Sequence, residues 1–87
     1  MKKAAIDEKP SPELQERSRI ARFNHMLGVK VAMARDIAGL SQDELAKMVG
    51  VSRVQITNIE NGISGTPVHR LVEIARALGV KPARLLP

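Results

Sequence analysis

The sequence predicts a small all-α protein. Three observations carry this prediction: apolar residues recur at steps of three and four, helix-capping patterns precede these runs, and glycine follows most of them. At 87 residues the chain is expected to form a single domain with a small hydrophobic core.

The stretch from 41 to 62, SQDELAKMVGVSRVQITNIENG, predicts two short helices joined by a tight turn. Each begins with a capping box, formed by Ser41 with Glu44 and by Ser52 with Gln55. Gly50 stands where the first helix would end with a positive φ, and Asn61-Gly62 closes the second in the same way. The inward-facing residues are predicted to be Leu45, Ala46, Val49, Val51, Ile56 and Ile59.

This stretch resembles the helix-turn-helix of phage-repressor-type regulators, the Cro/C1 or Xre family. The matching residues are Gln42, Leu45, Ala46, Gly50, Val51, Ser52, Ile56, Glu60, Asn61 and Gly62. The resemblance covers about residues 27 to 86. It implies an all-α fold: a five-helix phage-repressor-like helix-turn-helix domain, here with an additional N-terminal helical extension.

We therefore divide the chain into a flexible N-terminal arm (1–10), a helical extension (11–25) and a Cro/C1-type helix-turn-helix domain (26–87). Ser11 and Pro12 predict the N-cap and first residue of a helix. One apolar stripe then runs through Ile20, Phe23, Leu27, Val31 and Ala34. The pattern leaves open one long kinked helix or two helices that break near residues 24–28.

The C-terminal part predicts a fourth domain helix and a last turn. Thr66 is expected to cap this helix and Pro67 to be its first residue. Its inward face is predicted to comprise Val68, Leu71, Val72, Ile74, Ala75 and Leu78. After Pro82, Leu85 and Leu86 are expected to close the core.

Composition favours a polyanionic partner. The net charge is +5, and Phe23 is the only aromatic residue, which favours duplex DNA over single strands stacked on aromatic platforms. There is no cysteine, no apolar run long enough to span a membrane and no secretory signal pattern. These features predict a cytoplasmic, nucleoid-associated protein with no membrane partner.

The resemblance implies roles for individual residues. In this family, the second helix of the motif enters the major groove. The implied base contacts are Arg53, Val54 and Asn58, with Gln55 on the flank; the implied phosphate contacts are Gln42, Ser52, Thr57 and Asn61. Arg35 lies where the family carries an arginine paired with the glutamate before Asn-Gly, so a structural salt bridge between Arg35 and Glu60 is implied.

No residue pattern supports catalysis, a metal or a cofactor. His25 and His69 are isolated, and Asp43 and Glu44 suit the positive start of a helix better than an acid–base pair. We therefore expect a protein that is not an enzyme and has neither cofactor nor metal.

The resulting hypothesis is a sequence-specific regulator, a repressor that binds a palindromic operator as a homodimer. The candidate dimer contacts are Val80, Leu85 and the stretch 20–23. Two alternatives are an antitoxin that binds a toxin through residues 11–25 and a restriction–modification controller protein. An adaptor that lost DNA binding and a fragment of a longer regulator also remain open.

The loop 63–65 lacks the basic residues that many relatives carry there. Phosphate contacts could instead come from Lys2 and Lys3 on the arm and from Arg17, Arg19 and Arg22 on the extension. The alternatives are that the arm is a frayed terminus and that the three arginines form a solvated face or contact an acidic partner.

Overall fold

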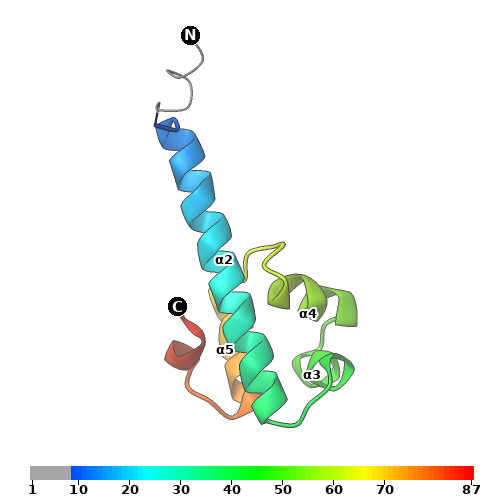
Figure 1. Cartoon of the computed structure of the whole chain (residues 1–87). Helices are drawn as coiled ribbons and strands as arrows, with labels where there is room; N and C mark the ends of the chain where they lie inside the picture. The colour runs from blue at the N-terminus through cyan, green and yellow to red at the C-terminus, as the bar shows by residue number, and fades with distance from the viewer. Residues whose placement is uncertain (1–8) are drawn as a thin grey trace.

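The computed structural model describes residues 9–87, and its elements are all helical within that range (Figure 1). They are α2 (Pro12–Ile37), α3 (Gln42–Val49), α4 (Arg53–Glu60), α5 (Val68–Leu78) and the 3₁₀ helix η1 (Pro82–Leu85). The all-α prediction is confirmed. The expected number of five domain helices plus an extension is slightly wrong, because the extension and the first domain helix are one element. The predicted arm at 1–10, with Lys2 and Lys3, lies almost wholly outside the described residues. None of the described helices is both long and apolar enough to cross a membrane.

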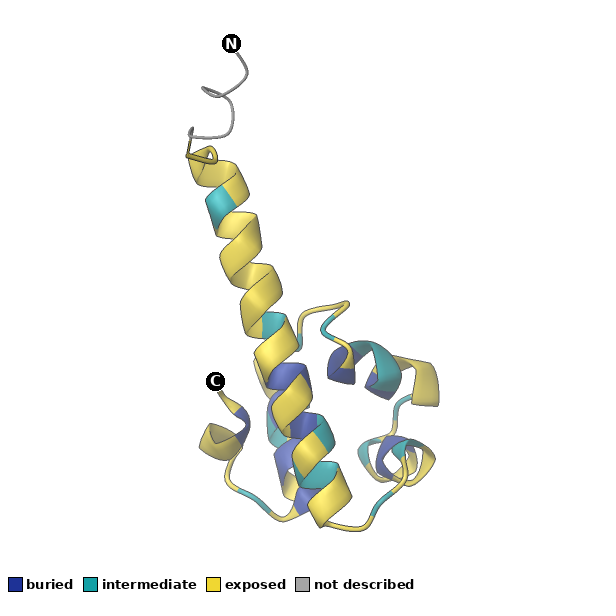
Figure 2. Cartoon of the chain, in the orientation of Figure 1, coloured by how far each residue is buried: buried dark blue, intermediate teal, exposed yellow. Residues whose placement is uncertain are grey.

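Helix α2 runs for 26 residues without a break near Asn24 to Gly28. It begins as predicted, since the Ser11 hydroxyl oxygen accepts a hydrogen bond from the Leu14 amide at 3.2 Å and Pro12 occupies the first turn. Only its C-terminal half packs against the domain, where Leu27 and Val31 are buried. The N-terminal half projects from the body as a nearly free helix (Figures 1 and 2).

The core lies where the C-terminal half of α2 meets α3, α4, α5 and η1. Its buried apolar residues are Leu27, Val31, Leu45, Ala46, Ile56, Ile59, Leu71, Ile74, Ala75, Leu78 and Leu85. Every short helix contributes one face to this cluster, as their sequence periodicity indicates. The cluster fixes α3 and α4 against the long helix.

Ile20 and Phe23, which are candidate dimer contacts, continue the apolar stripe and remain about half exposed, because α2 has left the domain body at that point. Three other expectations about burial are corrected by the structure. Val68, expected to face inward, is 76% exposed at the first turn of α5. Leu85 closes the core at 1% exposure and is therefore no surface residue, whereas Leu86 is turned outward.

The predicted glycine helix ends are present in the turns around the motif. Gly50 follows α3 with φ +86°, and Gly62 follows α4 with φ +70°. The predicted cap of α5 is wrong by one residue: Pro67 is the N-cap in an extended conformation, and α5 begins at Val68. The Thr66 hydroxyl oxygen is instead buried without a hydrogen-bond partner among the described residues.

Two glycines let the end of α4 lie directly on α2. A Cβ added to Gly28 would stand 2.5 Å from the Glu60 carbonyl oxygen, which is far inside normal contact. A Cβ added to Gly62 would stand 2.7 Å from the His25 Cα atom. The backbones therefore touch at this crossing, and the position of α4 is set by α2.

Candidate nucleic-acid interface

The outer face of α4 is formed by side chains that lie on the opposite side of the helix from its buried residues. Ile56, Ile59 and Glu60 are buried, which fixes the rotation of α4. With 100° between successive residues, the opposite face then carries Val54, Asn58 and Asn61. Arg53 and Thr57 lie on one flank of this face, and Arg53 is exposed because it is the first residue of the helix. The structure thus brings together most of the residues that the sequence assigned to a single contact surface.

The N-terminal end of this face is open to solvent and favourable to anions. Arg53 and Val54 are exposed in the first turn, and that turn carries no acidic side chain. Arg53 forms neither an ion pair nor a side-chain hydrogen bond within residues 9–87, so its guanidinium is available for a ligand. The partial positive charge of a helix N-terminus adds to this field.

The start of α4 is stabilised by a complete capping box. The backbone amide of Gln55 donates to the Ser52 hydroxyl oxygen at 3.1 Å, and the backbone amide of Ser52 donates to Gln55 Oε1 at 2.9 Å. The side-chain carbonyl of Gln55 is therefore engaged, and only its amide nitrogen is left for a base or phosphate. A second box at Ser41 and Glu44 stabilises α3, and the backbone hydrogen bond from Ser41 lowers the pKa of Glu44.

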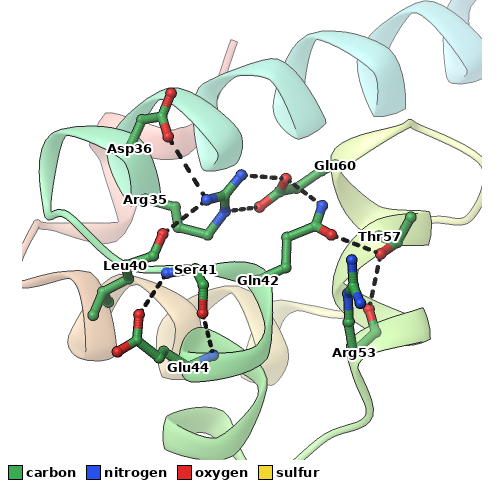
Figure 3. A network of polar contacts seen from close by, with 9 residues as sticks. All are labelled: Arg35, Asp36, Leu40, Ser41, Gln42, Glu44, Arg53, Thr57 and Glu60. Atoms are coloured by element: carbon green, nitrogen blue, oxygen red, sulfur yellow. Dashed lines mark hydrogen bonds and ion pairs between the residues drawn. The ribbon is translucent and has the colours of Figure 1, made fainter.

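A network of polar side chains ties α4 to both neighbouring helices (Figure 3). Arg35 on α2 donates from Nε to Glu60 Oε2 at 2.6 Å and from Nη2 to Glu60 Oε1 at 3.1 Å. Its Nη1 donates to the Leu40 carbonyl at 2.8 Å. The guanidinium thus joins the end of α4 to the α2–α3 connection by a bidentate ion pair.

Gln42 extends the same network from α3 to α4. Its Nε2 donates to Glu60 Oε1 at 2.9 Å, while its Oε1 accepts from the Thr57 hydroxyl at 3.1 Å. Thr57 also lies 3.0 Å from the Arg53 carbonyl, so its single proton is shared between two acceptors. The chain of contacts therefore runs from the buried carboxylate of Glu60 to the first turn of α4, where Arg53 stands.

Burial makes the Arg35–Glu60 pair a strong positional constraint. The two side chains are only 15% and 5% exposed. The hydrogen bond to Glu60 raises the pKa of Arg35, so the guanidinium stays charged under all ordinary conditions. Removing one partner would leave the other charge buried and uncompensated.

The structure thus places the four predicted phosphate residues in different situations. Ser52 and Asn61 sit at the two ends of α4 and are exposed, whereas Gln42 and Thr57 are half-buried and held by the network. The links from Gln42 to Glu60 and Thr57 were not derivable from residue spacing, because they depend on how α3 and α4 cross.

Comparison with known proteins identifies the protein family of this chain. The family model for helix-turn-helix proteins (HTH_3), which describes the Cro/C1-type domain, matches residues 31–85. The chain belongs to this family. No curated protein matches its sequence.

Solved structures of this HTH_3 family are similar over most of the chain. The restriction–modification controller protein C.AhdI from Aeromonas hydrophila is 26% identical, with a TM-score of 0.74 over 76% of this chain and 96% of that one. The P22 c2 repressor, solved with a synthetic operator, is 31% identical, with a TM-score of 0.66 over 70% and 92%. The DNA-binding domain of BldD is 29% identical, with a TM-score of 0.71 over 77% and 97%.

This HTH_3 protein is accordingly a DNA-binding transcriptional regulator and not an enzyme. Regulators of the family bind double-stranded DNA, which agrees with the duplex partner favoured by the composition. The matched range begins within α2, so the N-terminal half of that helix lies outside the family model.

Proposed function

We propose that this HTH_3 regulator is a repressor that binds a palindromic operator as a homodimer, with α4 inserted in the major groove. The observation that carries the proposal is the outer face of α4, whose leading arginine is exposed and unpaired within the described residues. The P22 c2 repressor, similar over most of the chain, was solved with a synthetic operator. A family likeness to a repressor–operator complex supports the same mode of binding here.

Three side chains on this face are proposed to read bases. Arg53 has the geometry to donate two hydrogen bonds to guanine O6 and N7, and Asn58 can pair with the adenine edge. Val54, 66% exposed, offers an apolar contact to a thymine methyl group. Gln55 contributes through its free amide nitrogen only.

Ser52, Asn61, Gln42 and Thr57 are proposed to position the domain on the phosphates. The two exposed residues, Ser52 and Asn61, flank the reading face and can donate directly. Gln42 and Thr57 are proposed to act mainly by holding α4 at a fixed angle, since their side chains are already bonded to each other. The salt bridge between Arg35 and Glu60 connects this polar network to α2.

The test begins with selection of duplexes from a random library, followed by fluorescence anisotropy on the selected site and on scrambled DNA. We expect an inverted repeat with half-sites about one helical turn apart, bound by two chains. Arg53→Ala should weaken binding to the selected site by about 1–3 kcal/mol and leave scrambled DNA little affected.

Arg76→Ala is the matched control, because it removes one exposed positive charge from α5, outside every proposed DNA contact. Equal losses for Arg53→Ala on both duplexes would reduce Arg53 to a phosphate contact. An asymmetric selected site bound by one chain would contradict the palindromic operator.

A second candidate function is that of a restriction–modification controller, favoured by the likeness to C.AhdI along nearly the whole of that chain. If the selected site is found upstream of restriction–modification genes, that location would distinguish a controller from other repressors. The antitoxin alternative depends on the exposed extension, where Leu14 and Ile20 are each about half exposed. Isolation of this protein in a stoichiometric complex with a toxin bound to residues 11–25 would favour the antitoxin function.

A further inference from the structure

Helix α2 carries a second apolar row, distinct from the face that packs into the core. Phe23, Met26, Met33 and Ile37 are 48%, 44%, 58% and 85% exposed. Their spacings of three, seven and four residues place them on one side of the helix, in a heptad-like pattern with Lys30 at the centre. We call these four apolar residues the α2 stripe.

The α2 stripe continues into a hollow on the domain surface. Met33 and Ile37 line this hollow together with Leu78 and Val80 from the end of α5 and the turn after it. Leu86, 42% exposed, lies just beyond Leu85, which also lines the hollow. An apolar surface therefore extends from the free half of α2 onto the body.

We infer that the α2 stripe is the contact surface for α2 of a second copy of this chain, packed antiparallel about a two-fold axis near Val29 and Lys30. The stripe is nearly symmetric about that point: seven residues separate Phe23 from Lys30 and Lys30 from Ile37, and Met26 and Met33 flank the centre. An antiparallel copy thus places Phe23 beside Ile37 of its mate and Met26 beside Met33. Self-matching of this kind is what a two-fold interface requires.

The charges beside the stripe favour the same orientation. Arg22 and Asp36 lie seven residues on either side of Val29, along one flank of the helix. Antiparallel packing brings Arg22 of each copy to Asp36 of the other, whereas parallel packing places these two flanks on opposite sides of the pair and leaves both charges unpaired. The Asp36 side chain is 83% exposed, and its one ion pair within the described residues is with Arg35, at 3.7 Å.

Lys30 at the centre sets a limit on the strength of this dimer. Its aliphatic stem can cover apolar surface while the ammonium reaches solvent at the rim. A polar residue at such a position fixes register and orientation but costs stability. The stripe is about 21 Å long, and contacts confined to it fall short of the roughly 800 Å² per partner of a typical stable interface. We therefore expect micromolar dissociation, with the hollow contributing to the contact.

Sedimentation equilibrium of the full chain without DNA tests the interface. The wild type should dimerise in the micromolar range, and Met33→Glu should weaken dimerisation at least tenfold. Lys30→Leu should strengthen it. Met48→Glu is the matched control, since Met48 is 56% exposed on α3, outside the stripe; circular dichroism confirms that each variant is folded. A monomeric wild type, or equal behaviour of Met33→Glu and Met48→Glu, would overturn the inference.

Cross-linking tests the orientation, because the chain has no cysteine of its own. A mixture of Met26→Cys and Met33→Cys chains, treated with a short bismaleimide, should yield far more covalent dimer than either variant alone. Preferential cross-linking of Met26→Cys with itself would indicate parallel packing and overturn the antiparallel arrangement.

The inference rests on the proposed function, because it supplies the interface for the proposed homodimer. The α2 interface and the proposed DNA reading can nevertheless be refuted separately. A chain that reads a specific site but stays monomeric without DNA would overturn the α2 interface alone. A chain that dimerises through the stripe but shows no sequence preference would overturn the proposed DNA reading alone.

Discussion

Replacing Gly28 by alanine should destabilise the protein, although alanine is the better helix former. A glycine inside a helix costs about 1 kcal/mol relative to alanine, so propensity alone predicts that Gly28→Ala is stabilising. The new Cβ would, however, lie 2.5 Å from the Glu60 carbonyl oxygen and 2.8 Å from the Glu60 carbonyl carbon, and both atoms belong to backbone. No side-chain rotation can relieve these contacts.

The size of the effect follows from the displacement that is needed. The end of α4 must retreat by about 1 Å to reach normal contact, which loosens Ile59 in the core and stretches the bidentate pair between Arg35 and Glu60. Overpacking of this kind typically costs about 1–3 kcal/mol and occasionally more. We expect a net loss of about 2 kcal/mol, or about 8–16 °C in Tm for a domain of this size.

Thermal and urea unfolding followed by circular dichroism measure this change. Ala21→Gly provides the matched control: Ala21 is exposed on the free half of α2, so this variant should lose only the intrinsic cost of glycine, about 1 kcal/mol or less. Gly28→Ala should also weaken specific DNA binding, since it displaces the helix proposed to read bases. A Gly28→Ala protein as stable as the wild type, or more stable, would refute the close-crossing argument.

Three further perturbations separate the other contributions. Arg35→Met should cost about 3 kcal/mol in chemical denaturation, because Glu60 stays buried without its main partner, whereas Arg19→Met, which breaks an exposed pair with Glu16, should change stability by less than about 1 kcal/mol; similar losses for both would show that burial of the pair is unimportant. The lowered pKa of Glu44 means that its charged form stabilises the fold above the unfolded pKa and that this stability is lost as pH falls through the folded value. Glu44→Gln should therefore lower Tm at neutral pH and have little effect well below pH 4; a constant difference across that range would contradict the assigned cause. Thr66→Val should raise stability by about 1 kcal/mol in urea unfolding, because it removes a buried hydroxyl that has no partner among the described residues; a loss would show that the hydroxyl is hydrogen-bonded in solution.

The sequence predicted the parts of the fold that depend on local chemistry. Ser41 and Ser52 each sit three residues before a side chain that can return the hydrogen bond, and Gly50 and Gly62 stand where only a left-handed residue closes the turn. Such patterns are decided within four residues, so spacing alone identifies them. The family resemblance added the partnership of Arg35 with Glu60, which are 25 positions apart.

The features that spacing could not predict depend on the tertiary arrangement. The periodicity of Ile20 and Phe23 is the same as that of Leu27 and Val31, yet only the second pair has a domain to pack against. Thr66 and Pro67 match a capping pattern, but Pro67 adopts an extended conformation and the helix begins one residue later. The hydrogen bonds of Gln42 with Glu60 and Thr57 depend on how α3 and α4 cross, and no local sequence pattern encodes that crossing.

The single long helix also makes the free half of α2 a rigid extension of the domain. From Gly28 to Pro12 the helix rises about 24 Å without a joint, and its base is held against the end of α4. Each residue inserted into the free half would turn everything beyond it by about 100° and lift it by about 1.5 Å. A fluorophore or protein attached to this half would thus report the orientation of α4, the helix proposed to read bases, and the angle of attachment could be changed one residue at a time.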